Sequence, residues 1–547
     1  MTTSEQALGA TPSSGNNRTA QDWPATRLEV HYTDRVFRCF AQRPTDVFAM
    51  VENAVKINGE GEALVCGRDR LSWRALHQAA MQVAGGLAAR NIQPGERIGL
   101  LAGNSKEFVI TVLAAAALGA VVVPIGIREQ MPGIQYILEH SGASVLIHDD
   151  ELTDRVPLQG VPALKHRFAI GRHGAADGFD VLTQSGPLAQ AAKVEEEDTA
   201  AILYTSGTTG KPKGAMLTHL GIVHSAMHFV IACGLGPSDR TAIVVPMSHV
   251  TGLVGLIASM VCCAGAIVAV PEFKAGAVLH LMAQERISYM IMVPAMYNLC
   301  LMQNELTELD LSSWRIGGYG GAPMPTATIA ALAEKLPGLG LLNAYGATET
   351  TSPATILPTR DAGTRGASVG LTVHCGDIII MGHDGRELAR GETGEIWIRG
   401  PMVVKGYWNN PAATADNFTA GFWHSGDIGM MDEAGYVYVL DRSKDMINRG
   451  GYKIFSVEVE NVLHGHPAIV EAAVVGTPCP VLGERVHAFI ATRHEVDAAA
   501  LQAHCARHLP DYKVPEGFTF CPDGLPRNAN GKLLKRDLRT RLSAPKA

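Results

Sequence analysis

The residues between Tyr204 and Gly214 form the stretch of the sequence that is richest in groups able to bind an anion. The stretch reads Tyr204-Thr205-Ser206-Gly207-Thr208-Thr209-Gly210-Lys211-Pro212-Lys213-Gly214. Glycines let backbone N–H groups approach a phosphate, and hydroxyl and ammonium groups donate further hydrogen bonds. Pro212 follows the first lysine, where a Walker A loop needs Ser or Thr. The stretch therefore predicts a triphosphate loop of another kind, which we favour over a solvated hairpin loop.

Four further polar segments follow it along the chain. Taken alone, three of them have a simpler interpretation: Thr348-Glu349 can cap a helix, Asp427 can form an Asx turn, and Lys532 can be a solvated turn residue. The segments are Asn343-Ala344-Tyr345-Gly346-Ala347-Thr348-Glu349, Gly421-Phe422-Trp423-His424-Ser425-Gly426-Asp427, Asp441-Arg442-Ser443-Lys444-Asp445 with Gly450-Gly451-Tyr452-Lys453-Ile454, and Pro526-Arg527-Asn528-Ala529-Asn530-Gly531-Lys532.

In this order, the motifs resemble those of the adenylate-forming superfamily, which includes acyl- and aryl-CoA synthetases, luciferases and peptide-synthetase adenylation domains. The resemblance runs from about residue 30 to residue 540 and is closest to the acyl-CoA synthetases. Ser425 stands where the family has threonine. Five ordered motifs are far more specific than any one of them.

The resemblance implies a role for each matching residue. Glu349 and Thr205 would hold magnesium, Asp427 with Arg442 would bind the ribose, and Tyr345 would stack on adenine. Lys532, His249, Thr348 and Glu349 would be catalytic, with His249 in a gating or positioning role. The other ATP or AMP contacts would come from Thr205, Ser206, Gly207, Thr208, Thr209, Gly210, Lys213, Gly321, Ala322, Asn343, Ala344, Gly346 and Thr348.

The activity implied by the resemblance is AMP-forming ligation of a carboxylic acid to coenzyme A, with ATP and Mg²⁺. The acid first becomes an acyl-adenylate, which then reacts with the CoA thiol. By the same resemblance, the C-terminal domain rotates about Lys444 between the two steps. The rotation removes Lys532 and brings up Gly450 and Gly451, which would line the CoA tunnel.

The elements that must position these residues alternate between strands and helices from Arg97 onward. This pattern predicts a mostly parallel sheet wrapped by helices. We expect strands at 97–101, 120–125, 143–148, 200–204, 241–245 and 289–293, and helices at 106–118 and 131–140. Beyond about Asp377, short strands at 377–381, 395–399 and 436–440 with Gly-rich turns predict a β-rich subdomain.

The predicted fold class is α/β, with a large N-terminal domain and a small, mobile α+β C-terminal domain. The expected divisions are a disordered tail at 1–25, the adenylation domain at 26–441, a hinge at 442–445 and the C-terminal domain at 446–547. A chain of 547 residues is longer than one core usually serves.

Composition excludes several other classes of protein. The net charge of −7 offers no basic excess for nucleic acid. The ten cysteines show no CxxC spacing, which fits a reducing cytoplasm. No secretory signal is visible, and we interpret the apolar run 252–270 as a buried helix and strand rather than a stable membrane span. The expected partners are small molecules, and a homodimer is left open.

The identity of the acid is the least determined part of the prediction. Its pocket is expected around 247–255, 317–321 and 344–355, segments without an obvious cation for a second carboxylate, which favours an aliphatic or aromatic monocarboxylic acid. One alternative is an adenylation enzyme that loads a carrier protein. Relatives that bind amino acids place an Asp near His249, and Met247 to Leu253 contains none. A second alternative is a nucleotide-binding regulator without catalysis, against which Lys532, Glu349 and Asp427 argue.

Overall fold

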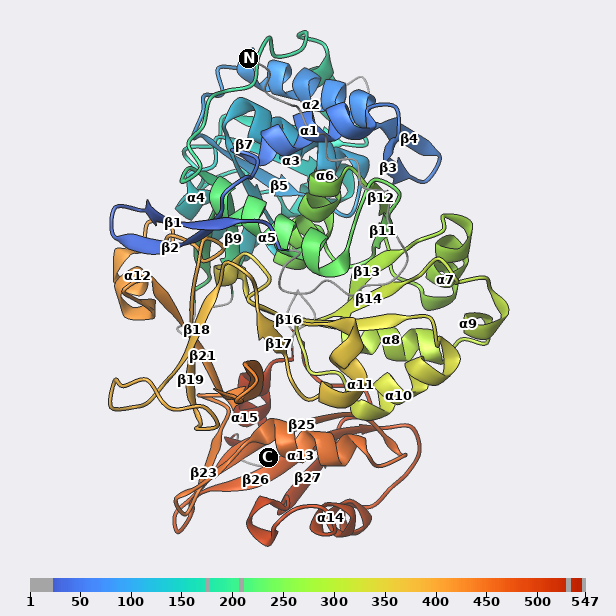
Figure 1. The fold of residues 1–547 in the computed structure, drawn as a ribbon, viewed down its shortest axis with the longest axis vertical. Helices are drawn as coiled ribbons and strands as arrows, with labels where there is room; N and C mark the ends of the chain where they lie inside the picture. The colour runs from blue at the N-terminus through green and yellow to red at the C-terminus, as the bar shows by residue number, and fades with distance from the viewer. Residues whose placement is uncertain (1–22, 173–176, 206–210, 528–532, 544–547) are drawn as a thin grey trace, which may run out of the picture.

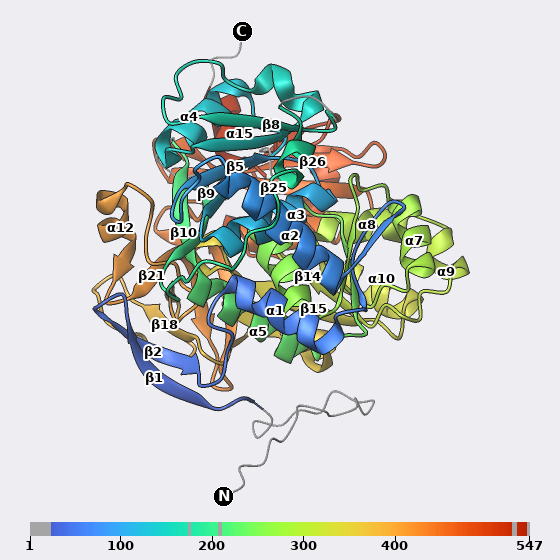
Figure 2. The same cartoon turned by 90° about the horizontal axis from the view of Figure 1, so that it is seen from above.

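The computed structural model of the chain describes residues 23–172, 177–205, 211–527 and 533–543 (Figure 1). The strands of these residues form four sheets: one of two strands, one of six, one of fourteen and one of five. The first is a hairpin of β1 (Thr26–His31) and β2 (Arg35–Phe40) at the edge of the molecule (Figures 1 and 2).

The six-stranded sheet carries the strand that leads into the predicted phosphate loop. Its order is β10-β9-β6-β5-β7-β8, parallel except that β10 returns antiparallel to β9 at the edge. The strands are β5 (Arg97–Leu101), β6 (Val121–Pro124), β7 (Val145–Asp149), β8 (His166–Ile170), β9 (Thr199–Thr205) and β10 (Lys213–Thr218).

The fourteen-stranded sheet changes from parallel to antiparallel pairing in its middle. Strands β15, β14, β13, β11, β12 and β3 are parallel neighbours, whereas β16 and all strands beyond it pair antiparallel. The strands are β3 (Glu62–Cys66), β4 (Asp69–Ser72), β11 (Arg240–Ile243), β12 (Ala266–Ala269), β13 (Tyr289–Met292), β14 (Ile316–Tyr319), β15 (Gly340–Tyr345), β16 (Thr355–Leu357), β17 (Gly370–Thr372), β18 (Asp377–Met381), β19 (Gly394–Arg399), β20 (Phe418–Thr419), β21 (Phe422–Met431) and β22 (Tyr436–Arg442).

Helices fill the space between these two sheets and cover their outer faces (Figures 1 and 2). Ile98 and Leu100 of β5 face the central core, and Leu101 faces the outer core under α4. Side chains alternate across a strand, so a strand buried on both faces is apolar throughout. The helices of the large domain are α1 (Val47–Asn58), α2 (Trp73–Ala88), α3 (Lys106–Leu118), α4 (Met131–Ser141), α5 (His219–Cys233), α6 (Ser259–Cys263), α7 (Ala275–Gln284), α8 (Pro294–Leu301), α9 (Glu305–Glu308), α10 (Thr326–Lys335), α11 (Ala362–Arg365) and α12 (Pro411–Asn417).

Short helical turns complete the large domain. One of them, η4 (Thr251–Ala258), is a π-helix and leads directly into α6 and then β12. The apolar run 252–270 is therefore a buried helical segment followed by a buried strand, as predicted. No helix in the described ranges is both long and apolar enough to cross a membrane. The other turns are η2 (Asp150–Arg155), η3 (Phe179–Thr183), η5 (Thr348–Thr350) and η6 (Thr359–Asp361).

The C-terminal residues form a separate α+β unit at one end of the molecule (Figure 1). Helices α13 and α14 pack on one face of its sheet and α15 on the other. The elements are β23 (Ile447–Arg449), β24 (Tyr452–Ile454), α13 (Ser456–His464), β25 (Ile469–Cys479), β26 (Gly483–Thr492), α14 (Ala498–Ala506), η7 (Asp511–Lys513), β27 (Gly517–Phe520) and α15 (Lys535–Ser543).

The predicted fold class is confirmed, with one difference in where the β-rich part begins. The bounds predicted for β5 and α3 agree with the structure, because Ser105 caps α3 at its start and Gly119 ends it in the left-handed conformation at φ 70°. The change to antiparallel pairing comes at β16, before Asp377, and the β-rich strands continue the parallel sheet. The mobility of the small domain and the division points at 25, 441 and 445 stay predictions.

We predict that Gly370→Ala strongly destabilises the fold. Gly370 has φ 101°, and a Cβ built there would lie 2.1 Å from the backbone of Ile356 and Leu357. Backbone strain and overpacking together should lower the free energy of unfolding by about 3 kcal/mol or more. The matched control is Gly385→Ala, where φ is 77° but a Cβ meets open space, so only about 1–2 kcal/mol should be lost. Denaturant unfolding measures both, and equal losses would contradict the packing argument.

Candidate active site

Asp427 is the centre of the first polar group in the predicted nucleotide site. It lies on β21, paired in register with Arg442 on β22, and it is only 4% exposed. Arg442 Nε lies 2.8 Å from Asp427 Oδ1, and the Tyr345 hydroxyl donates to Oδ2 at 2.6 Å. Burial and the charge of Asp427 hold the pKa of Tyr345 well above its usual value, so the phenol stays a donor. The structure thus brings together three residues that the sequence predicted separately.

Ser425 keeps the hydrogen bonds that a hydroxyl can make beside Asp427. Its Oγ donates to the carbonyl of Ile396 at 2.6 Å and accepts from the Asp427 N–H at 3.0 Å. Serine can therefore stand in the threonine position of the family motif, since both bonds need only the hydroxyl.

Glu349 is the centre of the second polar group. It is 9% exposed, and its Oε1 accepts from Thr205 Oγ1 at 3.4 Å and from the Tyr407 hydroxyl at 3.0 Å. Lys213 Nζ lies 4.9 Å from the centre of the Tyr407 ring, a cation–π distance. The predicted metal pair of Glu349 and Thr205 is therefore in contact, at the end of β9 where the phosphate loop begins.

An oxygen-only donor set of this kind fits magnesium, which prefers carboxylate and hydroxyl ligands shared with phosphate oxygens. The remaining loop residues, Ser206 to Gly210, lie outside the described residues, as does Lys532. Their roles stay predictions.

Tyr407 is a site residue that the sequence reasoning missed. Burial and the neighbouring carboxylate raise its pKa, so its hydroxyl remains a donor to Glu349. The backbone just before Tyr407 also holds Glu349, because Val404 N donates to the Glu349 carbonyl at 2.9 Å. The only sequence signal was an aromatic residue after Gly406, which on its own reads as core packing.

The turn that carries Thr348 and Glu349 is held in an uncommon backbone conformation. Thr351 and Ser352 have φ values of 49° and 40°, which residues other than glycine rarely adopt. The Thr350 hydroxyl stabilises the turn by accepting from Ala347 N at 2.9 Å. Such strain is often stored at functional sites. Thr348 is the first residue of η5, and its side chain is half-buried.

Close backbone approach marks the predicted adenine side. A Cβ on Gly320 would lie 2.5 Å from the Ala344 carbonyl oxygen, so only glycine fits there. Gly321 has φ 76° and Ala322 is exposed, which leaves backbone accessible at the end of β14.

Asn343 lies at the same edge but directs its amide inward. It is 8% exposed, and its Nδ2 lies 3.4 Å from the Ser368 carbonyl oxygen, to which it donates. Gly346 is exposed, and a Cβ there would lie 2.9 Å from Thr350 Oγ1. The geometry thus gives Asn343 a structural bond, and its predicted contact with ATP remains untested.

His249 opens the helical segment on the predicted acid side. It is half-buried, its N–H donates to Pro246 O at 3.1 Å, and its carbonyl accepts from Leu253 N at 2.8 Å. A Cβ on Gly252 would lie 2.4 Å from Pro246 O, so glycine lets the segment fold back on the preceding turn. π-Helical turns of this kind are frequent at functional sites.

Asn104 is a second residue that sequence reasoning missed. Its Nδ2 lies 3.0 Å from each of the carbonyl oxygens of Ile243, Val245 and Val270, and its Oδ1 accepts from Met247 N at 2.9 Å. This buried amide fixes the chain two residues before His249. In the sequence, Asn104 directly precedes the Ser105 helix cap, a position where an asparagine is typical of a turn.

Apolar groups meet where the predicted acid segments approach each other. A Cβ on Gly255 would lie 3.1 Å from Ile291 Cδ1 and 3.5 Å from the Phe229 ring, and one on Gly318 would lie 2.9 Å from Ile291 Cγ1. Ile291 and Phe229 are 3% and 1% exposed. Glycine at these two positions therefore lets the backbone pack closely against the apolar side chains of Ile291 and Phe229.

The predicted hinge is anchored on both sides of Lys444. Before it, Asp441 is 2% exposed and its Oδ2 accepts from Ser456 N of α13. After it, Asp445 pairs with Arg539 at 2.8 Å, and the same guanidinium lies 3.2 Å from the Lys444 carbonyl oxygen. Lys444 itself is exposed.

Gly450 and Gly451 form the tight turn between β23 and β24. Their φ values of 60° and 91° are those that two-residue hairpin loops require. Gly450 N donates to Leu482 O at 2.7 Å, and Gly451 N donates to Asn448 Oδ1 at 3.2 Å, both within the small domain. The glycines thus have a structural reason besides the predicted CoA tunnel.

The residues that flank Lys532 on both sides make contacts within the small domain, and Lys535 does so close to the hinge. Arg527 and Leu533 face each other in an antiparallel bridge. Lys535 Nζ contacts Glu460 Oε1 at 2.7 Å and Ser456 Oγ at 2.6 Å, next to the Asp441 contact. The chain just after Lys532 is therefore attached to α13, next to the Asp441 contact.

Comparison with known proteins agrees with this geometry. Residues 51–408 match the family model described as AMP-binding enzyme, and residues 458–532 match that of the AMP-binding enzyme C-terminal domain.

Curated relatives cover most of the chain. A feruloyl-CoA synthase of Amycolatopsis is 34% identical over 87% of this chain and 94% of its own length. A long-chain-fatty-acid–CoA ligase of Mycobacterium tuberculosis is 35% identical with the same coverage. A fatty acid–[acyl-carrier-protein] ligase of Streptomyces coeruleorubidus is 32% identical over 88% and 93%.

Solved structures share the arrangement of both domains. An ATP-bound MatB of Rhodopseudomonas palustris has a TM-score of 0.85 at 29% identity, covering 91% of this chain and 99% of that one. An anthranilate CoA ligase with bound anthranoyl-AMP has a TM-score of 0.86 at 27% identity, covering 91% and 98%. The predicted family resemblance is confirmed, and the chain belongs to the AMP-binding, adenylate-forming enzymes.

Proposed function

We propose that the protein is an AMP-forming carboxylic acid–CoA ligase. The observation that carries the proposal is the pair of buried carboxylates, Glu349 in contact with Thr205 at the start of the phosphate loop and Asp427 in contact with Tyr345 and Arg442. The Glu349 carboxylate is suited to the metal ion and phosphates of ATP, and the Asp427 carboxylate is suited to the ribose. Relatives named as CoA ligases for aromatic and fatty acids support the same reaction.

In the first step, the acid carboxylate attacks the α-phosphorus of ATP, and pyrophosphate leaves. The protein's part is positioning and charge stabilisation. Thr205 and Lys213 lie at the two ends of the phosphate loop, where they can bind phosphate oxygens, and Lys532 would approach the α-phosphate. Magnesium bound by Glu349 and Thr205 would neutralise charge on the phosphates.

In the second step, the CoA sulfur bonds to the acyl carbon as the thiol loses its proton. The bond from that carbon to the phosphate oxygen breaks, and AMP leaves. We propose that the small domain turns about Lys444 between the steps and presents the Gly450–Gly451 turn to the acyl-adenylate. The exposed position of Lys444 between two anchored segments supports this role. His249 would gate or position the acid.

The acid is proposed to be an aliphatic or aromatic monocarboxylic acid. The predicted pocket segments meet at apolar side chains, because Gly255 and Gly318 pack closely against the buried residues Phe229 and Ile291. Apart from Tyr319 and Tyr345, the ionisable side chains of the three segments are His249 and Glu349. Because neither is a permanent cation, a second carboxylate would lack a partner.

A carrier protein is the second candidate for the thiol acceptor. One relative of comparable identity is named a fatty acid–[acyl-carrier-protein] ligase, and both acceptors present the same pantetheine thiol. Comparison of free CoA with a carrier protein as acceptor separates the two.

All ten cysteines are free thiols, which supports our proposal of a reducing, cytoplasmic location. A homodimer stays an untested prediction.

We predict that ATP, magnesium, CoA and an accepted acid yield AMP, pyrophosphate and acyl-CoA in equal amounts. A panel of ferulate, anthranilate and medium- and long-chain fatty acids, followed by chromatography of the nucleotides, checks this. The non-Walker loop together with the Tyr345 to Glu349 motif motivates the prediction. Stoichiometric ADP and phosphate would contradict the mechanism.

We predict that Asp427→Ala weakens ATP binding at least tenfold. The ribose hydroxyls lose a charged acceptor, and such hydrogen bonds contribute about 1.5–3 kcal/mol. The loss should be much smaller with 2′,3′-dideoxy-ATP, which lacks those hydroxyls. Asp384→Ala, in an exposed ion pair with Arg386 outside the site, is the control. Equal losses for ATP and the dideoxy analogue would show that Asp427 acts only on the fold.

We predict that Lys532→Ala and Lys444→Pro affect opposite half-reactions. Removal of the lysine charge should slow acyl-adenylate formation about a hundredfold or more, while thioester formation from supplied acyl-adenylate continues. Proline fixes φ and should stiffen the hinge, which spares adenylation and slows thioester formation. Single-turnover assays of each step measure both effects. Equal slowing of both steps in both variants would contradict rotation about Lys444.

A further inference from the structure

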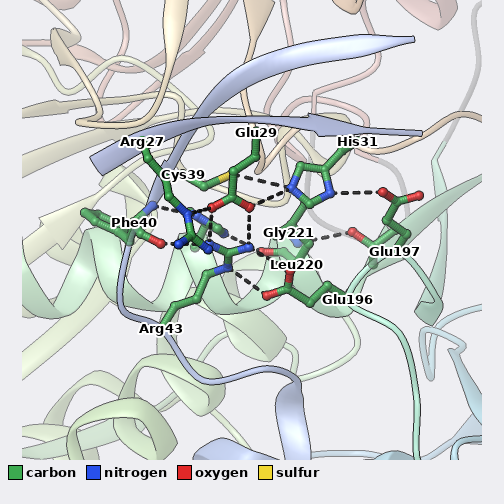
Figure 3. A network of polar contacts seen from close by, with 12 residues as sticks. Arg27, Glu29, His31, Cys39, Phe40, Arg43, Glu196, Glu197, Leu220 and Gly221 are labelled. Atoms are coloured by element: carbon green, nitrogen blue, oxygen red, sulfur yellow. Dashed lines mark hydrogen bonds and ion pairs between the residues drawn. The ribbon is translucent and has the colours of Figure 1, made fainter. Parts of the chain in front are cut away.

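The β1–β2 hairpin is held to the large domain by a partly buried network of charged side chains (Figure 3). Arg43 bonds both oxygens of Glu29, at 2.9 and 2.7 Å, and both oxygens of Glu196, at 2.7 and 2.6 Å. Its hydrogen bonds lower the pKa of Glu29 to about 2, so that carboxylate is charged at neutral pH. His31 Nδ1 lies 3.0 Å from Glu197 Oε1. An isolated two-stranded hairpin is barely stable, so this network keeps it in place.

Arg35, at the start of β2, reaches from this hairpin towards the nucleotide site. It is 8% exposed, and its guanidinium carbon lies 5.2 Å from the centre of the Tyr32 ring and 5.4 Å from that of Phe418. Its Nη1 donates to Val404 O at 3.0 Å and its Nη2 donates to Lys405 O at 2.8 Å. Within the described part of the chain, no carboxylate forms an ion pair with it. Its charge is compensated by two aromatic faces and two backbone dipoles.

The two carbonyls lie in the segment that holds Glu349. Val404 N donates to Glu349 O at 2.9 Å, and the Tyr407 hydroxyl donates to Glu349 Oε1 at 3.0 Å. Trp408 N donates to Gly214 O at 2.7 Å, which fixes the far end of the segment to β10. Arg35 therefore fixes two consecutive peptide planes between the backbone and side-chain contacts of Glu349.

We infer that Arg35 is a positioning residue for Glu349, acting through the Val404–Tyr407 segment. Each peptide plane moves as a unit. Because Arg35 holds the carbonyls of Val404 and Lys405, it sets the direction of the chain that leads to Tyr407 and so the position of the Tyr407 hydroxyl. That hydroxyl and the Thr205 hydroxyl both bond Oε1, and together they orient the carboxylate for a cation. The inference rests on the proposed role of Glu349 as a magnesium ligand.

Arginine is suited to this position in a way that lysine is not. The guanidinium is planar and offers donors from two nitrogens to two carbonyls at once, and it stacks on aromatic rings. A lysine ammonium could reach one carbonyl. Arg35→Lys should therefore restore only part of what Arg35→Ala loses. If Arg35 only anchored the hairpin, neither variant would change metal affinity in the folded protein.

The test measures metal affinity directly. Mn²⁺ is titrated into the full-length protein saturated with a non-hydrolysable ATP analogue, and bound ion is followed by electron paramagnetic resonance. Arg35→Ala should weaken Mn²⁺ binding about tenfold. It should also raise the magnesium concentration for half-maximal pyrophosphate release by a similar factor, while the KM for the acid stays within about twofold of that of the unchanged protein. Arg38→Ala is the matched control, an exposed arginine on the same strand that should change neither.

Two further variants separate the possible outcomes. Tyr407→Phe should weaken Mn²⁺ binding, and combining it with Arg35→Ala should add little, because both act on one carboxylate. Unchanged Mn²⁺ affinity in Arg35→Ala, with any lost activity explained by a lower melting temperature, would overturn the inference. Glu349→Gln tests the proposed function itself: if it too leaves Mn²⁺ affinity unchanged, the metal role of Glu349 fails, and not only the role of Arg35.

Discussion

A buried carboxylate keeps its charge only where donors surround it, and Glu349 is 9% exposed. Its donors come from Thr205 at the end of β9 and from Tyr407, while its backbone carbonyl is bonded by Val404 N. These segments are far apart in sequence, so the carboxylate can be accommodated only after the six-stranded sheet and the β-rich strands have come together. The site therefore forms with the assembled large domain rather than in any one motif.

Asp427 shows the same constraint at the other end of the predicted nucleotide site. Its partner Tyr345 ends β15, the last parallel strand, and Asp427 itself lies on the antiparallel side of the same sheet. Ligands in α/β proteins bind beyond the carboxyl ends of parallel strands, where the order of the sheet changes. The continuous sheet across β15 and β16 allows residues from its parallel and antiparallel halves to reach one nucleotide.

How far the sequence predicted the structure depended on whether the signal was local. Strand β5 and helix α3 were predicted with the observed bounds, because their apolar runs and the Gly119 that ends α3 are local signals. Asp427 and Glu349 were found through motifs. Tyr407, Asn104 and Arg35 were not, because neutral or ordinary surface residue types acquire a role only through partners 58, 143 and 369 residues away.

The ribose contact and the hinge are adjacent, and this arrangement bears on the proposed alternation of domains. Arg442 bonds Asp427, and the preceding Asp441 bonds the first residue of α13 in the small domain. A rotation that begins at Lys444 lies beyond the Asp427–Arg442 pair, so the nucleotide site can stay intact while the small domain turns. The Asp441–Ser456 bond, however, joins the two domains across the hinge and must break or stretch. Burial raises the pKa of Asp441, and the positive charge of Lys535, whose ammonium donates to Ser456 Oγ, opposes that rise. Lys535, three residues after Lys532, is thus linked through Ser456 to Asp441, which precedes Arg442. In the proposed rotation, this route would connect movement of the lysine segment to the predicted hinge.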